Sequence, residues 1–263
     1  MVNIVNVEVI DQEAGIHALY LNNPETRNSM TLEMGLAFHR NLQGLASLDP
    51  LPRVVIIMGR NNVFSSGGDF QLLQSFSEKS RIENQEFMES FYRLFLAVRE
   101  MPFPVIACVN GHAIGAALSL ALACDLRLFL PNAKYAFNFV RIGIHPGMGS
   151  SFLLKEVAGL TQAQDLLLTG RYISGTEAFN RGLCHGIYEV DQIFDQALLL
   201  AKEISQSAPN SIRLLKRTLY NTNDLYSALR REAKCQAENY VSQDFLEAIT
   251  AIQEKRTPKF NDK

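Results

Sequence analysis

The chain has 263 residues, of which 47% are hydrophobic and 20% are charged, a composition typical of a globular protein rather than a disordered one. Its formal net charge of -2 gives no electrostatic reason to expect nucleic acid or an anionic membrane surface as a partner. Its longest apolar runs, such as residues 105–109 and 115–124, are far shorter than a membrane-spanning helix, so we expect no membrane partner either.

The first half of the chain predicts strands alternating with helices. A turn at Glu13–Gly15 between two apolar segments indicates an opening β-hairpin. Thr31 is expected to cap the first long helix, because threonine is favoured at that position. The predicted hairpin strands are 5–9 and 16–21, the predicted helices are 31–48 and 83–101, and the predicted buried strands are 54–59 and 105–109.

The second half is expected to become mostly helical. Strands are predicted at 126–130 and 135–140, and helices at 115–124, 150–157, 162–168, 193–205, 209–220, 226–241 and 244–255. The four cysteines show no C-x-x-C spacing, which favours free thiols over disulfides or a metal site. The first residues do not have the pattern of a signal peptide, so we expect a cytoplasmic protein.

Two segments combine a buried strand with a glycine-rich turn. The first is Phe64–Asp69 (FSSGGD), which follows the predicted strand 54–59, and the second is Pro104–Ala116 (PVIACVNGHAIGA), which leads into a helix. A helix start carries unpaired backbone N–H groups and a partial positive charge, so it can bind an anionic atom. Each segment alone also fits a close-packed strand-to-helix corner.

Together these segments resemble the crotonase superfamily, the enoyl-CoA hydratase/isomerase family. The resemblance continues at Asn23–Met30, at Leu168–Leu183 and at Glu254–Phe260, and so covers nearly the whole chain. It implies an α/β fold, with a crotonase-like spiral core of repeated ββα turns and a C-terminal helical trimerisation region. Without it, the element pattern would equally fit a doubly wound α/β sheet.

The resemblance also divides the chain in two. Residues 1–190 are expected to form the spiral core with an acyl-CoA pocket. Residues 191–263 are expected to form a helical region for oligomerisation and CoA capping, which implies a homotrimer or a hexamer. CoA enters only as part of the substrate, either as acyl-CoA or as an acyl-carrier thioester, and no separate cofactor or metal is expected.

Enzymes of this family stabilise a thioester enolate with two backbone N–H groups. The matching donors here are Gly68 and Ala116, although the family usually has glycine at the second position. Preorganised donors of this kind are worth on the order of 3 kcal/mol each in protease oxyanion holes. Asp69 is expected to hold its own turn rather than to take part in catalysis.

Further residues are expected to bind substrate or CoA. Arg27 matches a position near the CoA phosphates, although an exposed, solvated arginine fits this position equally well. Lys255 and Phe260 resemble the C-terminal element that reaches the CoA of a neighbouring subunit in homologues. The other expected substrate or CoA contacts are Ser29, Ser66, Gly68, Asp69, Phe70, His112, Gly115, Asn138 and Ile142.

The chain departs from the family at its acid–base positions. The two glutamates of true hydratases correspond to Ser119 and Phe139, and the carboxylate of some other members corresponds to Gly147. Ser119 is expected to bond back to its own helix. His145 lies beside the expected cleft and is the candidate titratable group, while His112 flanks the oxyanion turn. Either histidine is more often structural than catalytic.

Three functional hypotheses therefore remain. The first is a hydratase or isomerase with relocated acid–base groups, in which water addition is weak. The second is a decarboxylase, because Asn138–Gly149 (NFVRIGIHPGMG) resembles enzymes that process polyketide β-branches. Those enzymes usually have Gly-Gly-Thr where this chain has Gly67, Gly68 and Asp69. The third is an acyl-CoA-binding protein without catalytic activity.

Overall fold

The computed structural model describes residues 3–220 and 222–260. Within them, six strands form a central sheet in the order β1-β2-β3-β4-β6-β9. β1 and β2 are antiparallel, which confirms the predicted hairpin, and the remaining neighbours are parallel. The strands are β1 (Val5–Asp11), β2 (Ile16–Leu21), β3 (Val54–Gly59), β4 (Val105–Val109), β6 (Leu126–Phe129) and β9 (Gly186–Ile187).

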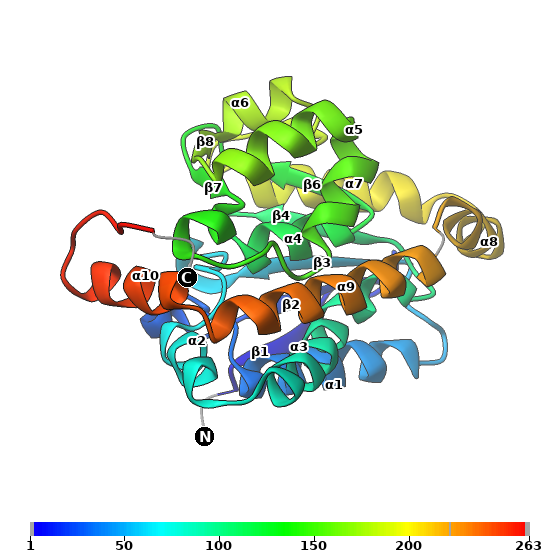
Figure 1. The fold of residues 1–263 in the computed structure, drawn as a ribbon. Coiled ribbons are helices and arrows are strands. Elements are labelled where there is room, and N and C mark those ends of the chain that lie inside the picture. The colour runs from blue at the N-terminus through cyan, green and yellow to red at the C-terminus, as the bar shows by residue number, and fades with distance from the viewer. Residues whose placement is uncertain (1–2, 221, 261–263) are drawn as a thin grey trace.

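Helices cover both faces of this sheet (Figure 1). One face packs against α1 (Leu32–Ala46), α3 (Arg81–Leu96) and α4 (Ala116–Ala123), and the other against α7 (Ile193–Ser205). In β3, Val55 and Ile57 belong to the first core, and Val54 and Ile56 to the second. A strand buried on both faces needs an uninterrupted apolar run, as residues 54–57 provide.

A smaller second sheet gives the core its spiral form. It contains β5 (Ala113–Ile114), β7 (Lys134–Ala136) and β8 (Ile173–Ser174). The chain passes from β4 to β5 and then into α4, and again from β6 to β7 and on to α5 (Ser150–Thr169). Each turn contributes one strand to each sheet, so the predicted crotonase-like ββα core is confirmed.

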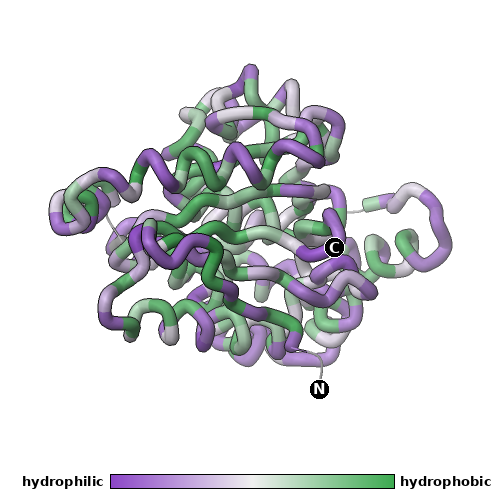
Figure 2. The backbone as a smooth tube through the Cα atoms, turned by 180° about the vertical axis from the view of Figure 1, so that it is seen from behind, coloured by the Kyte–Doolittle hydropathy of each residue, from purple (hydrophilic) through white to green (hydrophobic). Residues whose placement is uncertain are grey.

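The remaining helices lie around this core. They are α2 (Phe70–Ser75), α6 (Gly175–Asn180), α8 (Pro209–Leu219), α9 (Thr222–Tyr240) and α10 (Gln243–Gln253). α9 packs along α3 and crosses the front of the molecule, while α8 and α10 lie at opposite ends (Figure 1). Hydrophobic stretches follow the central strands, whereas polar residues alternate along the outer helices (Figure 2). No helix in the described ranges is long and apolar enough to cross a membrane.

The predicted strand at residues 135–140 is wrong beyond Ala136. The strands that pair with β7 are only two residues long, so the ladder has no partner after the hydrogen bond from Gly115 N to Ala136 O at 2.7 Å. The chain continues as a 3-10 helix, Asn138–Ile142, which ends at Gly143 with a φ of 71°. This change of direction turns Asn138 and Phe139 toward a cavity.

Candidate functional site

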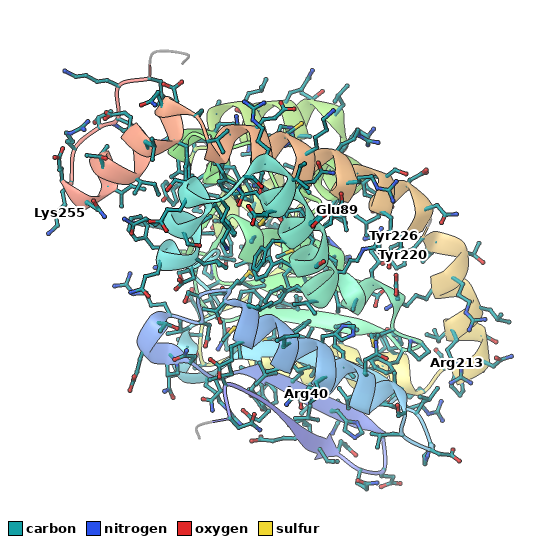
Figure 3. The ribbon with its side chains drawn as sticks, turned by 60° about the horizontal axis from the view of Figure 1, so that its bottom comes forward. Arg40, Glu89, Arg213, Tyr220, Tyr226 and Lys255 are labelled. Atoms are coloured by element: carbon teal, nitrogen blue, oxygen red, sulfur yellow. The ribbon has the colours of Figure 1, made fainter. Side chains whose placement is uncertain are left out.

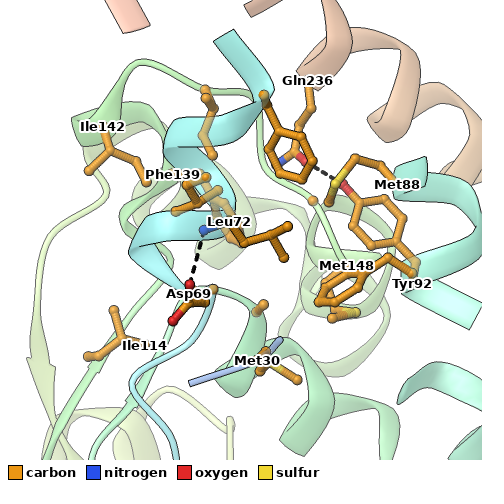
Figure 4. A pocket seen from close by; sticks show the side chains of 18 of the residues that line it. Met30, Asp69, Leu72, Met88, Tyr92, Ile114, Phe139, Ile142, Met148 and Gln236 are labelled. Atoms are coloured by element: carbon orange, nitrogen blue, oxygen red, sulfur yellow. Dashed lines mark hydrogen bonds between the residues drawn. The ribbon is translucent and has the colours of Figure 1, made fainter. Parts of the chain in front are cut away.

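An apolar cavity of about 100 Å³ lies where the two glycine-rich segments meet α3 and α9 (Figure 4). Its more accessible walls include Ser66, Gly68 and Ile142, whereas its deep walls include Tyr92 and Met148, both at most 2% exposed. The complete lining is Met30, Ser66, Gly68, Asp69, Leu72, Leu73, Phe76, Met88, Phe91, Tyr92, Ile114, Gly115, Ala116, Asn138, Phe139, Ile142, Ile144, Gly147, Met148, Gln236 and Tyr240.

The two predicted N–H donors lie side by side on this lining. Ser65 forms a parallel bridge with Ala113, and Ser65 N donates to His112 O at 3.2 Å. Gly68 and Ala116 follow this bridge at the same distance along their segments. Neither of their N–H groups makes a hydrogen bond to another described residue. Ala116 is the first residue of α4, where an unpaired N–H is expected.

Glycine is required at two points of this arrangement. A side-chain carbon at Gly67 would lie 2.2 Å from Ile114 O, and Gly67 has a φ of 87°. The same carbon would lie 3.7 Å from Ala116 N, which shows how closely the two segments approach. Gly115 has a φ of 55° and a ψ of -117°, a conformation that favours glycine. These positions explain the glycine-rich sequence without reference to the ligand.

Asp69 has a structural task at the accessible side of the cavity. Its side chain accepts from Leu72 N at 3.0 Å, which caps α2, and from Ser29 Oγ at 3.0 Å. Both carboxylate oxygens therefore have partners, in agreement with the expectation that Asp69 holds its own turn. Ser29 is 6% exposed and does not line the cavity.

The two positions that correspond to glutamates differ in their surroundings. Ser119 is fully buried, does not line the cavity, and bonds back to Gly115 O at 3.3 Å, as predicted. Its Oγ also lies 2.6 Å from Ser150 Oγ, and Ser150 Oγ donates to Gly147 O. Phe139 does line the cavity, at 6% exposure, so the position expected to correspond to the second glutamate carries an aromatic ring.

The structure does not bring the two candidate histidines to the cavity. His145 N donates to Asn239 Oδ1 at 2.7 Å, and the ring Nδ1 lies 2.7 Å from Pro146 O, so the ring is engaged outside the lining. His112 is exposed and its Nδ1 accepts from Lys134 N at 2.9 Å. His145 was the predicted titratable group of the site, but its side chain does not line the cavity.

Other predicted contacts also lie away from the cavity. Arg27 is exposed, but its carbonyl accepts from Ser66 N at 2.9 Å, which places its backbone next to the lining. Phe70, the first residue of α2, is half-buried and is not part of the lining. Lys255 lies at the outer edge of the molecule after α10 (Figure 3), and Phe260 is 44% exposed.

The deep end of the cavity contains a polar cluster that the sequence did not reveal. Tyr92 on α3 donates to Gln236 Oε1, Tyr240 Oη donates to the same oxygen at 3.1 Å, and Gln236 Nε2 donates to His145 O at 2.7 Å. Burial raises the pKa of both tyrosines well above the ordinary value, so both stay protonated at neutral pH. In the sequence, the only indication of this cluster was that polar side chains occur on otherwise apolar helix faces.

Glu232, one turn before Gln236 on α9, holds the loop that forms the deep wall. Its carboxylate accepts from Gly149 N at 2.6 Å and from Ser151 N at 2.9 Å, at the start of α5. Because Glu232 is 1% exposed, burial raises the pKa of its carboxyl group to about 7. Glu232 does not line the cavity itself.

The lining favours stabilisation of an oxyanion over acid–base catalysis. Among the described residues, Asp69 is the only carboxylate on the lining, and no lysine, arginine or histidine lies there. No group of His, Cys, Asp and Glu in the described ranges has the composition of a metal site. The cavity therefore offers backbone N–H donors, hydroxyl and amide groups, and apolar surface.

Known proteins of one family are similar to this chain over nearly its whole length. The sequence profile described as "Enoyl-CoA hydratase/isomerase" matches residues 11–263. A "Putative enoyl-CoA hydratase" of Thermus thermophilus is 36% identical over 251 residues, which cover 95% of this chain and 98% of that protein. The human "Enoyl-CoA hydratase domain-containing protein 2, mitochondrial" is 34% identical, with coverage of 94% and 86%.

Among solved structures, an enoyl-CoA hydratase/isomerase from Pseudoalteromonas atlantica superposes with a TM-score of 0.84. It is 28% identical in sequence, and the alignment covers 98% of this chain and all of the other. The profile match spans both glycine-rich segments, the spiral core and the C-terminal helices. The chain therefore belongs to the enoyl-CoA hydratase/isomerase family.

Proposed function

We propose that the protein acts on an acyl thioester, acyl-CoA or an acyl-carrier thioester, whose carbonyl oxygen lies between the N–H groups of Gly68 and Ala116. The observation that carries this proposal is the pair of unbonded backbone donors beside one apolar cavity. In such a water-poor site, fixed donors stabilise the negative charge that develops on the oxygen when an enolate forms. Ser66 and Ile142 then border the path of the thioester arm.

We infer that water addition to an enoyl thioester is slow in this protein. Ser119 is walled off from the cavity and Phe139 carries no acid or base. A positioned general acid or base contributes about 10²–10⁴-fold to a rate, and both expected groups are absent. The first hypothesis, a hydratase or isomerase, then requires acid–base groups that differ from the family's two glutamates.

Decarboxylation is the second candidate, because it needs no base on the cavity wall. The bond between the α-carbon and the carboxylate breaks, its electron pair forms the enolate, CO₂ leaves, and a proton from solvent then adds to the α-carbon. The oxyanion donors stabilise that enolate. The lack of any free carboxylate on the described lining favours this reaction over base-catalysed ones.

A panel of thioesters distinguishes these reactions. Crotonyl-CoA, a 3-enoyl-CoA and methylmalonyl-CoA are incubated with the protein and followed by mass. We expect little hydration of crotonyl-CoA, and either double-bond migration or loss of CO₂ from the matching substrate. Hydration at a rate comparable to that of family members with two glutamates would contradict the proposed mechanism. Tight binding of all three without turnover would support the non-catalytic hypothesis instead.

The oxyanion site itself is tested by removing one N–H. Ala116→Pro deletes the donor, and proline is well tolerated at the first residue of a helix. We expect turnover to fall about 10²–10³-fold, the usual cost of one lost oxyanion donor. Ala116→Gly keeps the N–H and serves as the matched control, with near-normal turnover. Equal activity of the two variants would contradict the role of this donor.

The oligomeric state and the cellular location of the protein are also proposals. We infer a homotrimer or hexamer and a cytoplasmic location, with CoA only as part of the substrate. The human relative named above is described as mitochondrial, so cell fractionation is the measurement that decides the location.

A further inference from the structure

The polar cluster of Tyr92, Gln236 and Tyr240 lies at the closed end of the cavity. These three residues are at most 2% exposed, while Gly68 and Ile142 on the same lining are more accessible. Figure 4 shows Gln236 and Tyr92 on the side of the cavity opposite Asp69 and Ile114. An acyl group whose thioester lies at Gly68 and Ala116 therefore extends toward this cluster.

The cluster keeps hydrogen-bonding capacity that its internal bonds do not use. Gln236 Oε1 accepts from both tyrosines, and Gln236 Nε2 uses one of its two hydrogens on His145 O. The second amide hydrogen has no acceptor among the described residues. Tyr240 Oη donates its only hydrogen, and no described group donates to its lone pairs. The cluster therefore offers both a donor and an acceptor.

Gly147 shows that the cluster is packed in place. A side-chain carbon at residue 147 would lie 2.4 Å from Tyr92 Oη and 2.5 Å from Gln236 Nε2. The phenol and the amide thus occupy the space of a side chain at the position where some superfamily members have a carboxylate. The polar groups at this end of the cavity come from α3 and α9 instead.

The charge of the lining decides which substituent fits. An isolated buried carboxylate is strongly unfavourable without a cation, and no cationic side chain lies on the described lining. A purely apolar chain end would leave the free donor and acceptor without partners, which disfavours its binding. A hydroxyl group satisfies both, because it donates and accepts at once.

We propose that Tyr92, Gln236 and Tyr240 form a hydroxyl-binding subsite, so that the preferred acyl group carries a hydroxyl at its end remote from the thioester. This inference rests on the proposed function, because it takes the acyl chain to enter from Gly68 and Ala116. The small cavity limits that chain: about 100 Å³ accommodates on the order of seven water-sized atoms.

Calorimetric binding of matched thioesters tests the subsite. 4-Hydroxybutyryl-CoA and pentanoyl-CoA have the same number of non-hydrogen atoms and differ by one hydroxyl. We expect the hydroxyacyl thioester to bind about tenfold more tightly, and succinyl-CoA to bind more weakly than both. Equal affinity for the first two would overturn the subsite while leaving the proposed function intact. No binding of any acyl-CoA would overturn the proposed function as well.

Variants locate the effect at the cluster. Tyr92→Phe and Tyr240→Phe each remove one oxygen from the cluster, and we expect each to reduce the tenfold preference for the hydroxyacyl thioester over pentanoyl-CoA. Tyr226→Phe is the matched control, because Tyr226 lies on α9 beside Arg93 and outside the cavity. A full hydroxyl preference in the double variant Tyr92→Phe/Tyr240→Phe would overturn the assignment.

Discussion

Glu232 combines a buried position with hydrogen-bond partners that are all donors. Its carboxylate accepts from two backbone N–H groups and from the Ser151 hydroxyl. These donors favour the ionised form, while burial disfavours it, and burial has the larger effect because it raises the pKa from 4.5 to about 7. The protonation state of a carboxyl group that holds the loop at Gly147–Gly149 therefore changes near neutral pH.

Because of Glu232, the free energy of unfolding is expected to decrease as the pH rises. Between its unfolded pKa of 4.5 and its folded pKa of about 7, only the folded state keeps the proton. Its contribution is complete below pH 4.5 and is lost as pH rises through 7, a change of about 3 kcal/mol. Urea unfolding of wild type and Glu232→Gln at pH 4 and pH 8 measures the difference. Parallel pH dependences of the two proteins would contradict this assignment.

Arg27 and Lys255 are the predicted contacts of the CoA phosphates, and both are exposed. We expect Arg27→Ala and Lys255→Ala to weaken CoA binding severalfold at low salt and much less at high salt, because exposed charges are screened. Titration calorimetry at two salt concentrations is the measurement. Arg213→Ala is the control, since Arg213 lies at the opposite end of the molecule from Lys255 (Figure 3). Unchanged CoA affinity in both variants at low salt would show that Arg27 and Lys255 are solvated surface residues that do not contact the CoA phosphates.

At the scale of elements, a buried ion pair fastens α8 to the central sheet. Lys216 Nζ donates to Asp125 Oδ2 at 2.7 Å and to Phe103 O at 2.9 Å. The same Asp125 oxygen accepts from Val105 N at 2.7 Å, at the start of β4. Lys216 and Asp125 have side-chain exposures of 8% and 16%, so solvent screens the pair only weakly.

Removal of one partner is expected to leave the other charge buried. Lys216→Met should destabilise the protein by about 3 kcal/mol, the lower end for a broken buried pair. Lys202→Met is the control, because Lys202 pairs with Asp11 at the surface and should matter far less. Thermal and urea unfolding give the values. Similar small losses in both variants would show that Lys216 is not an anchor.

The central strands, the cap of α1 and the two glycine-rich turns could be predicted because each depends on local sequence, whereas the spiral arrangement was expected from the family resemblance. The apolar run of β3, the capping Thr31 and the glycines beside Gly68 and Ala116 specify their own conformations. The end of β7 could not be predicted, because it depends on the length of its neighbours. Likewise, α2 is a short helix whose capping by Asp69 the residues alone did not indicate.

The deep end of the site could not be predicted for a different reason. Tyr92 and Gln236 are separated by 144 residues and meet only when α9 packs on α3. On the sequence, Tyr92 is one of several aromatic residues in the predicted helix 83–101, and nothing distinguishes it from Phe91 or Phe95. For His145 the sequence predicted a site residue, but the structure does not place its ring at the cavity. The ring Nδ1 instead lies against Pro146 O.

The whole molecule presents an apolar surface at one end. α8 exposes Leu215 and Leu219, which are 53% and 63% exposed and lie one turn apart on the helix. A cluster of exposed leucines on a helix far from the cavity is typical of a protein–protein contact. This face belongs to the C-terminal region, 191–263, that the family resemblance associates with trimers.

We therefore expect trimers or hexamers that depend on this face. Light scattering at micromolar concentration should give three or six times the mass of one chain. Leu215→Glu with Leu219→Glu should lower that mass, because two buried carboxylates without partners oppose association. Ile82→Glu on α3 is the control: Ile82 is 71% exposed and lies outside the C-terminal region. A monomeric mass for the wild type would contradict the expected trimer or hexamer. A trimer unaffected by the two α8 substitutions would show that the subunit contact does not depend on this face.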